Sequence, residues 1–368
     1  MKIGIDCRLH YYNRTGIGRY IRNLIREFPE SANAEMELVL LQSRREREAL
    51  LQAPRMRCRR VFTPAHHPVE RWFLAAEIAA QRLDVLHSPD HVAPKRKGWE
   101  SVVTIHDLSF LAHPEAYDSA SLLYYTQVFR TLPRTARVIT VSEFTRHEVL
   151  NRISIAPEKV ISVYEAVDPA YYTRPEASCE RIRRRLGISE PYILVVGTIE
   201  ARKNLERVIE AYDVLPRRDR PQLVFAGGRG YQYENVLEAV QGHRLQDQVK
   251  FLGFVDDAKL PMLYTSAVCL LFPSLYEGFG LPILEAMACG CPVITSNFGS
   301  MAEVAGDAAI LVDPNSAAAI AHGITTLLDD TALRDGMIAG GHARVKQFSW
   351  RTAAQQTLAV YREAAGPH

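Results

Sequence analysis

The stretch "AVCLLFPSLYEGFGLPILEAMACGCPVITSN", residues 267–297, contains two short apolar runs separated by a glycine turn and a helix pattern. Apolar runs of this length joined by a helix are typical of neighbouring strands in a parallel sheet. Pro282 has the fixed backbone angle that suits the first turn of a helix, and Gly278 and Gly280 permit a tight turn before it. The stretch therefore predicts a strand, a turn, a helix and a second strand.

The same alternation extends over the whole chain in two series. Strands of the first series are expected at residues 2–6, 37–41, 84–88, 101–107, 137–142 and 159–164. Strands of the second are expected at residues 192–198, 222–228, 249–255, 267–274, 292–297 and 308–313. Continuous apolar strands separated by helices are typical of parallel sheets covered on both faces. We therefore expect an α/β protein with two doubly wound, Rossmann-like domains rather than one barrel, which needs an uninterrupted ring of units.

The two series meet in an arginine-rich segment that lacks a strand pattern. We accordingly expect an N-terminal domain at residues 1–172, a linker at 173–190 and a C-terminal domain at 191–345. The remaining residues, 346–368, include an amphipathic helix pattern at 350–365.

The composition is that of a globular enzyme, with 47% hydrophobic and 23% charged residues. No apolar run approaches the roughly 20 residues that cross a bilayer, and "MKIGIDCRLH" at 1–10 has the pattern of a strand rather than a signal peptide. Among the six cysteines only Cys289 and Cys291 are close, and a lone C-x-C pair is a poor zinc signal. We therefore expect reduced thiols, no bound metal and a cytoplasmic location.

The net charge of +2 is unevenly distributed. Residues 1–188 contain 29 Lys and Arg against 22 Asp and Glu, whereas residues 189–368 contain 15 against 20. The arginine-rich segment 44–60 is either a solvated surface or a patch for an anionic partner, which would be a membrane surface or a phosphate-bearing acceptor. Nucleic acid is not expected as a partner, because no recognition motif or aromatic array accompanies the charge.

Ligands of open parallel sheets bind beyond the carboxyl ends of the strands, and two motifs of the first series lie there. In "RTGIGRY", 14–20, Gly16 and Gly18 let the backbone approach a ligand at a helix N-terminus; a plain loop before a helix is an equal alternative. In "TIHDLSF", 104–110, His106 can hydrogen-bond a sugar or phosphate, with Asp107 setting its tautomer. The alternative is a structural histidine at a strand end.

Two motifs of the second series also follow strands. "VVGTIEARKNL", 195–205, has Gly197 at a strand end and the cations Arg202 and Lys203 just before a helix. Two adjacent cations fit a diphosphate whose oxygens need neutralisation, and a solvated Arg-Lys pair is the alternative. In "VFAGGRG", 224–230, Gly227 suits a nucleotide lying across the sheet edge, although glycines after strands are common turns.

The turn between Glu277 and Glu285 is the third candidate of the second series. Free amide groups of residues 280–283 and the helix dipole are expected to bind phosphate. Glu285 can accept hydrogen bonds from a ribose diol, and Glu277 can reach a sugar or its charged transition state. The residues between them that we expect at the donor are Gly278, Phe279, Gly280, Leu281, Pro282 and Ile283.

Together these motifs resemble the retaining glycosyltransferase family 4 over nearly the whole chain. The most specific are the E-x7-E pair of Glu277 and Glu285 and "GTIEARKNL" about eighty residues earlier, while "TGIGR" and "VTIHD" stand at the expected positions. "ISVYEAVD", 161–168, resembles the end of the family's first domain. Glu165-Ala166 replaces the more usual Asn-Gly there, and we do not expect this departure to touch the chemistry.

The resemblance implies the GT-B fold, in which two Rossmann-like domains face each other across a cleft. It implies that the first domain is on the acceptor side and that the last helix, in 346–368, crosses back to it. By the same resemblance, Arg202 and Lys203 would hold the donor diphosphate and Glu285 the ribose.

For the other residues the resemblance implies contacts with the donor sugar and the acceptor. Glu277 and His106 would contact the donor sugar, while Gly16 and Gly18 would lie at the diphosphate and the acceptor cleft. The family is usually discussed as reacting by same-face attack, in which the leaving phosphate takes the acceptor's proton. Glu277 would then be a positioning and electrostatic residue rather than a nucleophile.

The implied activity is transfer of a hexose from a nucleotide sugar to a saccharide or lipid-linked saccharide in bacterial cell-surface polysaccharide synthesis. We expect GDP-mannose as the donor, and UDP-glucose, UDP-N-acetylglucosamine and deoxyhexose donors stay open. No cofactor or metal is expected, because no D-x-D motif occurs in a matching place. A sugar phosphorylase, an epimerase and a non-catalytic sugar-binding protein are the alternatives, and the sequence predicts no oligomeric state.

Overall fold

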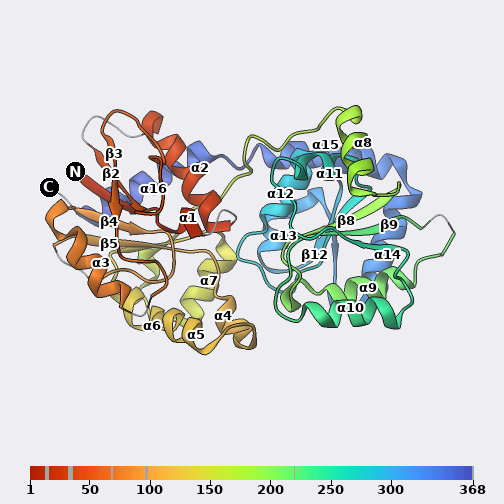
Figure 1. Cartoon of the computed structure of the whole chain (residues 1–368), viewed down its shortest axis with the longest axis horizontal. Helices are drawn as coiled ribbons and strands as arrows, with labels where there is room; N and C mark the ends of the chain where they lie inside the picture. Colours follow the sequence, from red (N-terminus) through yellow and green to blue (C-terminus); the bar gives the residue numbers. More distant parts are fainter. Residues whose placement is uncertain (13–15, 32–35, 68, 96–97, 219, 367–368) are drawn as a thin grey trace. The chain divides into compact units, whose positions relative to one another are not determined.

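The computed structural model describes residues 1–12, 16–31, 36–67, 69–95, 98–218 and 220–366 (Figure 1). The chain forms two compact units. Unit 1 comprises Met1–Glu165 together with Ser349–His368, and unit 2 comprises Ala166–Phe348.

The core of unit 1 is a seven-stranded sheet in the order β3-β2-β1-β4-β5-β6-β7, in which every pair is parallel. Its strands are β1 (Lys2–Asp6), β2 (Glu37–Ser43), β3 (Met56–Val61), β4 (Val85–Ser88), β5 (Glu100–Ile105), β6 (Arg137–Thr140) and β7 (Val160–Ser162). Ile3 pairs with Leu38 on one side and Val85 on the other, and all three are fully buried. Burial on both faces explains why the central strands are continuous apolar runs.

Eight α-helices of unit 1 are described, and the last of them comes from the end of the chain. They are α1 (Leu9–Tyr12), α2 (Gly16–Ser31), α3 (Glu70–Ile78), α4 (Ser109–Ala112), α5 (Ser119–Tyr125), α6 (Val128–Thr131), α7 (Glu143–Arg152) and α16 (Trp350–Ala365). Helix α16 packs beside α2 and over β4, β5 and β6 (Figure 1). Tyr361 of α16 hydrogen-bonds through its hydroxyl to Nδ1 of His87 at 2.6 Å, and burial lowers the pKa of His87 to about 3, so that this ring is neutral.

Unit 2 has a six-stranded parallel sheet in the order β10-β9-β8-β11-β12-β13. Its strands are β8 (Tyr192–Val196), β9 (Gln222–Ala226), β10 (Val249–Phe251), β11 (Cys269–Phe272), β12 (Val293–Ser296) and β13 (Ile310–Val312). Its α-helices are α8 (Glu176–Leu186), α9 (Leu205–Asp213), α10 (Tyr233–Gly242), α11 (Leu260–Ser266), α12 (Leu281–Ala288), α13 (Gly299–Ala305), α14 (Ala317–Asp329) and α15 (Thr331–Val345). Apolar side chains of α9 and α14 pack on the strands to form one contiguous core.

Both sheets have the doubly wound strand order, which confirms the predicted α/β class. In each sheet the direction of winding reverses once, between β1 and β4 in unit 1 and between β8 and β11 in unit 2. The loops after the two central strands diverge at such a point, and ligands of doubly wound proteins bind there.

The unit boundary differs from the expected linker. The chain passes from unit 1 to unit 2 between Glu165 and Ala166, and the segment 173–190 contains α8, which packs against α11. The apolar side chains of Cys179 and Ile182 are buried on one face of α8. This explains why the arginine-rich helix packs against unit 2 and does not act as a linker between the two units. Strand β3 is an element that we did not predict, because exposed arginines interrupt its apolar pattern at the sheet edge.

In the part of the chain that the structure describes, no helix combines the length and the apolar character needed to cross a membrane.

Candidate active site

Three charged side chains meet at the point of unit 2 where the winding reverses. Arg202 and Lys203 lie in a short 3-10 helix (Ala201–Lys203) just after β8, and Glu277 follows β11, the neighbouring strand. Lys203 donates a hydrogen bond to Oε1 of Glu277, and Arg202 pairs with Oε2 at 2.8 Å. The sequence predicted the two cations and the carboxylate as separate contacts with the donor, and their direct pairing is new.

The pairing determines the charge of Glu277. Burial raises the pKa of this carboxyl, but the neighbouring guanidinium of Arg202 and ammonium of Lys203 outweigh burial and hold its pKa at about 2. Burial lowers the pKa of Lys203 below its usual value, against the opposing effect of Glu277. Glu277 is therefore ionised at neutral pH and can orient or stabilise positive charge, but it has no proton to donate.

Two glycines follow the ends of the neighbouring strands β8 and β9. Gly197 has φ +125°, and a Cβ there would lie 3.2 Å from Cε of Lys203. A Cβ on Gly227, at the end of β9, would lie 1.7 Å from the carbonyl oxygen of Gly197. Gly197 is thus required by its positive φ and by the nearby Lys203 side chain, and Gly227 by the close approach of the two strand ends. These structural reasons are separate from the predicted contact with a nucleotide.

The turn before α12 is built largely from buried residues. Gly280 has φ +103° and caps the helix, whose second residue is Pro282. Phe279 packs edge-on against Phe348, with ring centroids 5.8 Å apart, and Ile283 is fully buried. The packing of these two side chains holds the turn in place.

The turn has fewer free amide N–H groups than we expected from the sequence. The amide of Ile283 donates to the carbonyl of Gly280 at 2.9 Å, and Pro282 has no amide hydrogen. The expectation of four free amides at 280–283 was therefore wrong for these two positions. Leu281 and Gly278 stay predicted donor contacts through the backbone.

Glu285 lies inside α12 and is 4% exposed. Its Oε2 accepts a hydrogen bond of 2.9 Å from the Tyr264 hydroxyl on α11. This contact orients the carboxylate, and its predicted role at a ribose diol stays a prediction.

In unit 1, His106 follows β5 directly and is held by a residue that the sequence analysis set aside. Its Nδ1 donates to Oε1 of Glu165 at 3.0 Å, while its buried Nε2 has no hydrogen-bond partner among the described residues. Asp107 instead accepts from the amide and hydroxyl of Ser109. Glu165, rather than Asp107, therefore sets the tautomer of His106, and our expectation that the Glu165-Ala166 departure leaves the site untouched was wrong.

The predicted glycine motif of unit 1 begins α2. Its first residues, 14 and 15, lie outside the described part of the chain. Gly16 has φ +41° and Gly18 is buried in the first turn of the helix. Tyr20, two residues later, packs edge-on against His106 with centroids 4.8 Å apart. The structure thus brings the start of α2 and His106 together within unit 1.

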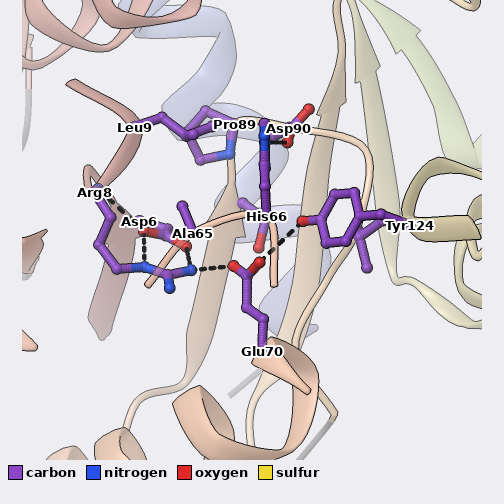
Figure 2. A pocket seen from close by; sticks show the side chains of 11 residues that line it. Asp6, Arg8, Leu9, Ala65, His66, Glu70, Pro89, Asp90 and Tyr124 are labelled. Atoms are coloured by element: carbon purple, nitrogen blue, oxygen red, sulfur yellow. Dashed lines mark hydrogen bonds and ion pairs between the residues drawn. The ribbon is translucent and has the colours of Figure 1, made fainter. Parts of the chain in front are cut away.

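A second polar cluster lies at the winding reversal of unit 1, between the ends of β1 and β4, and no motif pointed to it (Figure 2). Arg8 bonds to both oxygens of Asp6 and pairs with Glu70, whose second oxygen accepts from the Tyr124 hydroxyl at 3.1 Å. We call the cavity above this network the β1/β4 pocket. Its further lining residues are Leu9, Ala65, His66, Ser88, Pro89, Asp90 and Val92.

Comparison with known proteins identifies the family. The sequence profile described as "Glycosyltransferase Family 4" matches residues 14–171, and the profile "Glycosyl transferases group 1" matches residues 179–344. The O-antigen chain mannosyltransferase B of Escherichia coli is 34% identical over 282 residues, which cover 76% of this chain and 74% of that protein. The chain belongs to glycosyltransferase family 4.

This glycosyltransferase is also similar to longer and more distant proteins. The serotype-specific mannosyltransferase WbdA of Escherichia coli is 31% identical over 71% of this chain, and the match spans 33% of WbdA. The structure of sucrose-phosphate synthase from Thermosynechococcus elongatus superposes with a TM-score of 0.78 at 21% identity, covering 98% of each chain. This likeness supports the GT-B fold. In the present chain, the charged cluster of Arg202, Lys203 and Glu277 lies where the winding of the second sheet reverses.

Proposed function

We propose that this glycosyltransferase is a retaining, metal-independent mannosyltransferase that uses GDP-mannose. Its acceptor would be a saccharide or lipid-linked saccharide in cell-surface polysaccharide synthesis. The observation that carries the proposal is the cluster of Arg202, Lys203 and Glu277, which combines two cations for a diphosphate with an ionised carboxylate for a sugar. The name of the relative from Escherichia coli supports mannose as the sugar.

In the proposed reaction the acceptor oxygen forms a bond to C1 of mannose as the bond from C1 to the diphosphate oxygen breaks. The electron pair of the broken bond stays with GDP, whose phosphate oxygen takes the acceptor's proton on the same face of the sugar. Arg202 and Lys203 would turn from Glu277 to the diphosphate and stabilise its growing negative charge. Glu277 would stabilise the positive charge that develops at C1. His106, oriented by Glu165, would offer the lone pair of Nε2 to a hydroxyl of the donor sugar.

Nucleotide binding tests the donor. A ligand that binds only the folded state raises its melting temperature, so GDP should raise the melting temperature of the enzyme and UDP should not. A shift with UDP alone would replace GDP-mannose by a UDP-sugar. GDP release from GDP-mannose that rises when a mannoside acceptor is added would separate a transferase from an epimerase or a binding protein, and EDTA should leave that rate unchanged.

We further propose that this protein acts in the cytoplasm at the surface of the inner membrane. Unit 1 has three exposed aromatic side chains on and beside α3, Phe62, Trp72 and Phe73, which are 69%, 57% and 62% exposed. Arg44 lies over the ring of Phe62 and Lys95 over that of Trp72, 4.0 Å from its centroid. Exposed aromatic rings flanked by cations are typical of proteins that bind anionic lipid interfaces.

Vesicle flotation tests the membrane contact. The enzyme should float with vesicles containing phosphatidylglycerol and not with pure phosphatidylcholine, and salt should weaken the binding. The double variant Trp72→Ser/Phe73→Ser should lose binding. Phe254→Ser is the matched control, because Phe254 is 70% exposed but belongs to unit 2. Equal flotation of all three proteins would contradict the proposal.

A further inference from the structure

The β1/β4 pocket contains a buried hydroxyl group that lacks a partner. Ser88, the last residue of β4, lines the pocket and is 3% exposed. Its Oγ has no hydrogen-bond partner among the described residues. A buried hydroxyl without a hydrogen-bond partner is destabilising, so the pocket is suited to receive a polar group that bonds to Ser88.

The charged side chains around the pocket do not favour an anion. The Arg8 guanidinium already donates to Asp6, Glu70 and the carbonyl oxygens of Thr63 and Pro64. All five N–H groups of this guanidinium are therefore engaged, and none is spare for a phosphate. The carboxylates are acceptors and repel negative charge.

His66, which lines the pocket, and the neighbouring His91 are engaged as well. Asp90 accepts from Nε2 of His66 at 2.5 Å and from Nδ1 of His91 at 2.6 Å. Nε2 of His91 also faces an acceptor, the carbonyl oxygen of Asp107, so both of its ring nitrogens donate and the ring is cationic. Asp90 raises the pKa of both histidines against the lowering effect of burial. Because the Arg8 and His91 cations already pair with the carboxylates of Asp6, Glu70 and Asp90, a neutral ligand fits better than a charged one.

The remaining chemistry of the pocket is that of a carbohydrate site. A sugar hydroxyl can accept from one group and donate to another, which suits Ser88 beside carboxylate oxygens. The ring of His66 is partly exposed and packs beside the ring of Tyr124, with ring centroids 5.0 Å apart, so the pocket has aromatic side chains in its lining (Figure 2). The enclosed part of the pocket has room for about one water molecule. It can thus take a single hydroxyl group, while the sugar ring stays at the mouth.

We propose that the β1/β4 pocket is an acceptor subsite in which Ser88 binds one hydroxyl group of the acceptor saccharide. The sugar ring lies at the mouth, beside the partly exposed ring of His66. The proposal rests on the proposed function, because it takes the acceptor to be a saccharide. Unlike the proposed function, saccharide binding at this subsite requires no group of the donor site in unit 2.

Binding of methyl α-D-mannopyranoside, followed by saturation-transfer NMR titration, tests the subsite. Ser88→Ala should raise the dissociation constant about five- to tenfold, the effect of one hydrogen bond, and leave GDP binding unchanged. Ser162→Ala is the matched control, because Ser162 also ends a strand of this sheet but its hydroxyl already bonds to Thr140 and Ser142. It should bind the mannoside like the wild type.

Deoxy analogues identify the hydroxyl group. One of the 2-, 3-, 4- and 6-deoxy methyl mannosides should have a raised dissociation constant for the wild type. Ser88→Ala should not raise the constant of that analogue further, as expected for two groups that contact each other. Equal losses for every analogue in both proteins, no mannoside binding to the wild type, or an unchanged constant in Ser88→Ala would overturn the subsite and indicate a bound water only.

The proposed function fails separately. If GDP-mannose is not turned over but mannoside binding depends on Ser88, the saccharide subsite stands and the transferase does not. If turnover is normal and the acceptor KM of Ser88→Ala equals that of the wild type, the subsite falls and the transferase stands.

Discussion

The Lys203 ammonium donates a hydrogen bond to the Glu277 carboxylate, although the two residues are 74 positions apart in the chain. They meet because β8 and β11 are neighbours at the winding reversal of the second sheet. Both residues are at most 9% exposed. Removal of either partner leaves the other as a buried charge with fewer opposite charges around it, which is destabilising. A variant at this pair is therefore expected to lower both the stability of unit 2 and its activity.

Glu277→Gln and Lys203→Ala should each reduce kcat at least a hundredfold, because each removes charge stabilisation from the proposed transition state. Both should also lower the melting temperature. Glu210→Gln, which breaks the surface pair with Arg207, is the control and should change neither quantity. Full activity in either variant of the buried pair would refute the role assigned to that residue.

Glu165→Ala should raise the KM for the donor about tenfold, because His106 loses the acceptor that orients its ring. Glu165→Gln should recover most of the affinity, since its amide oxygen can still accept from Nδ1 of His106. Steady-state kinetics at varied donor concentration, with melting temperatures as the check on folding, measures the effect. Equal kinetics for the alanine variant and the wild type would show that Glu165 has no positioning role.

Gly227→Ala should destabilise unit 2 severely and abolish nucleotide binding, because the new Cβ would collide with the Gly197 carbonyl. Gly228→Ala is the adjacent control, since a Cβ there meets nothing within 4 Å. Thermal unfolding with and without GDP compares the two. A Gly227→Ala protein that melts and binds GDP like the wild type would disprove the close approach of the two strand ends.

Acid should remove the contribution of Glu277 to stability. Its pKa of about 2 in the folded protein is below the ordinary value of 4.5. The contribution is therefore fully present above the unfolded pKa and is lost as the pH falls from about 4.5 towards 2. Urea unfolding at pH 7, 5, 4 and 3 should show the stability difference between wild type and Glu277→Gln narrowing with acid. A difference that is constant over this range would count against the depressed pKa.

Local pattern determined the architecture of this protein. Strands buried on both faces must be continuous apolar runs, and the helices between them must be amphipathic. The doubly wound class can therefore be predicted from the sequence. The same rule positions Arg202, Lys203 and Glu277 beyond strand ends, where ligands bind. The pattern failed at β3, since an edge strand needs little apolar surface and Arg59 and Arg60 can stay in solvent.

Tertiary structure alone decided which of these residues touch. Strand order sets which loops become neighbours, and it brought Glu165 rather than the adjacent Asp107 to His106. It also enclosed Ser88 among charged groups from two distant segments, which contain Asp6 and Arg8 and, further along the chain, Glu70. Such contacts depend on which strands far apart in sequence become neighbours in the sheet, so composition and motif spacing do not predict them. The residues beyond the strand ends were therefore predictable, whereas their pairing and charge states followed only from the fold.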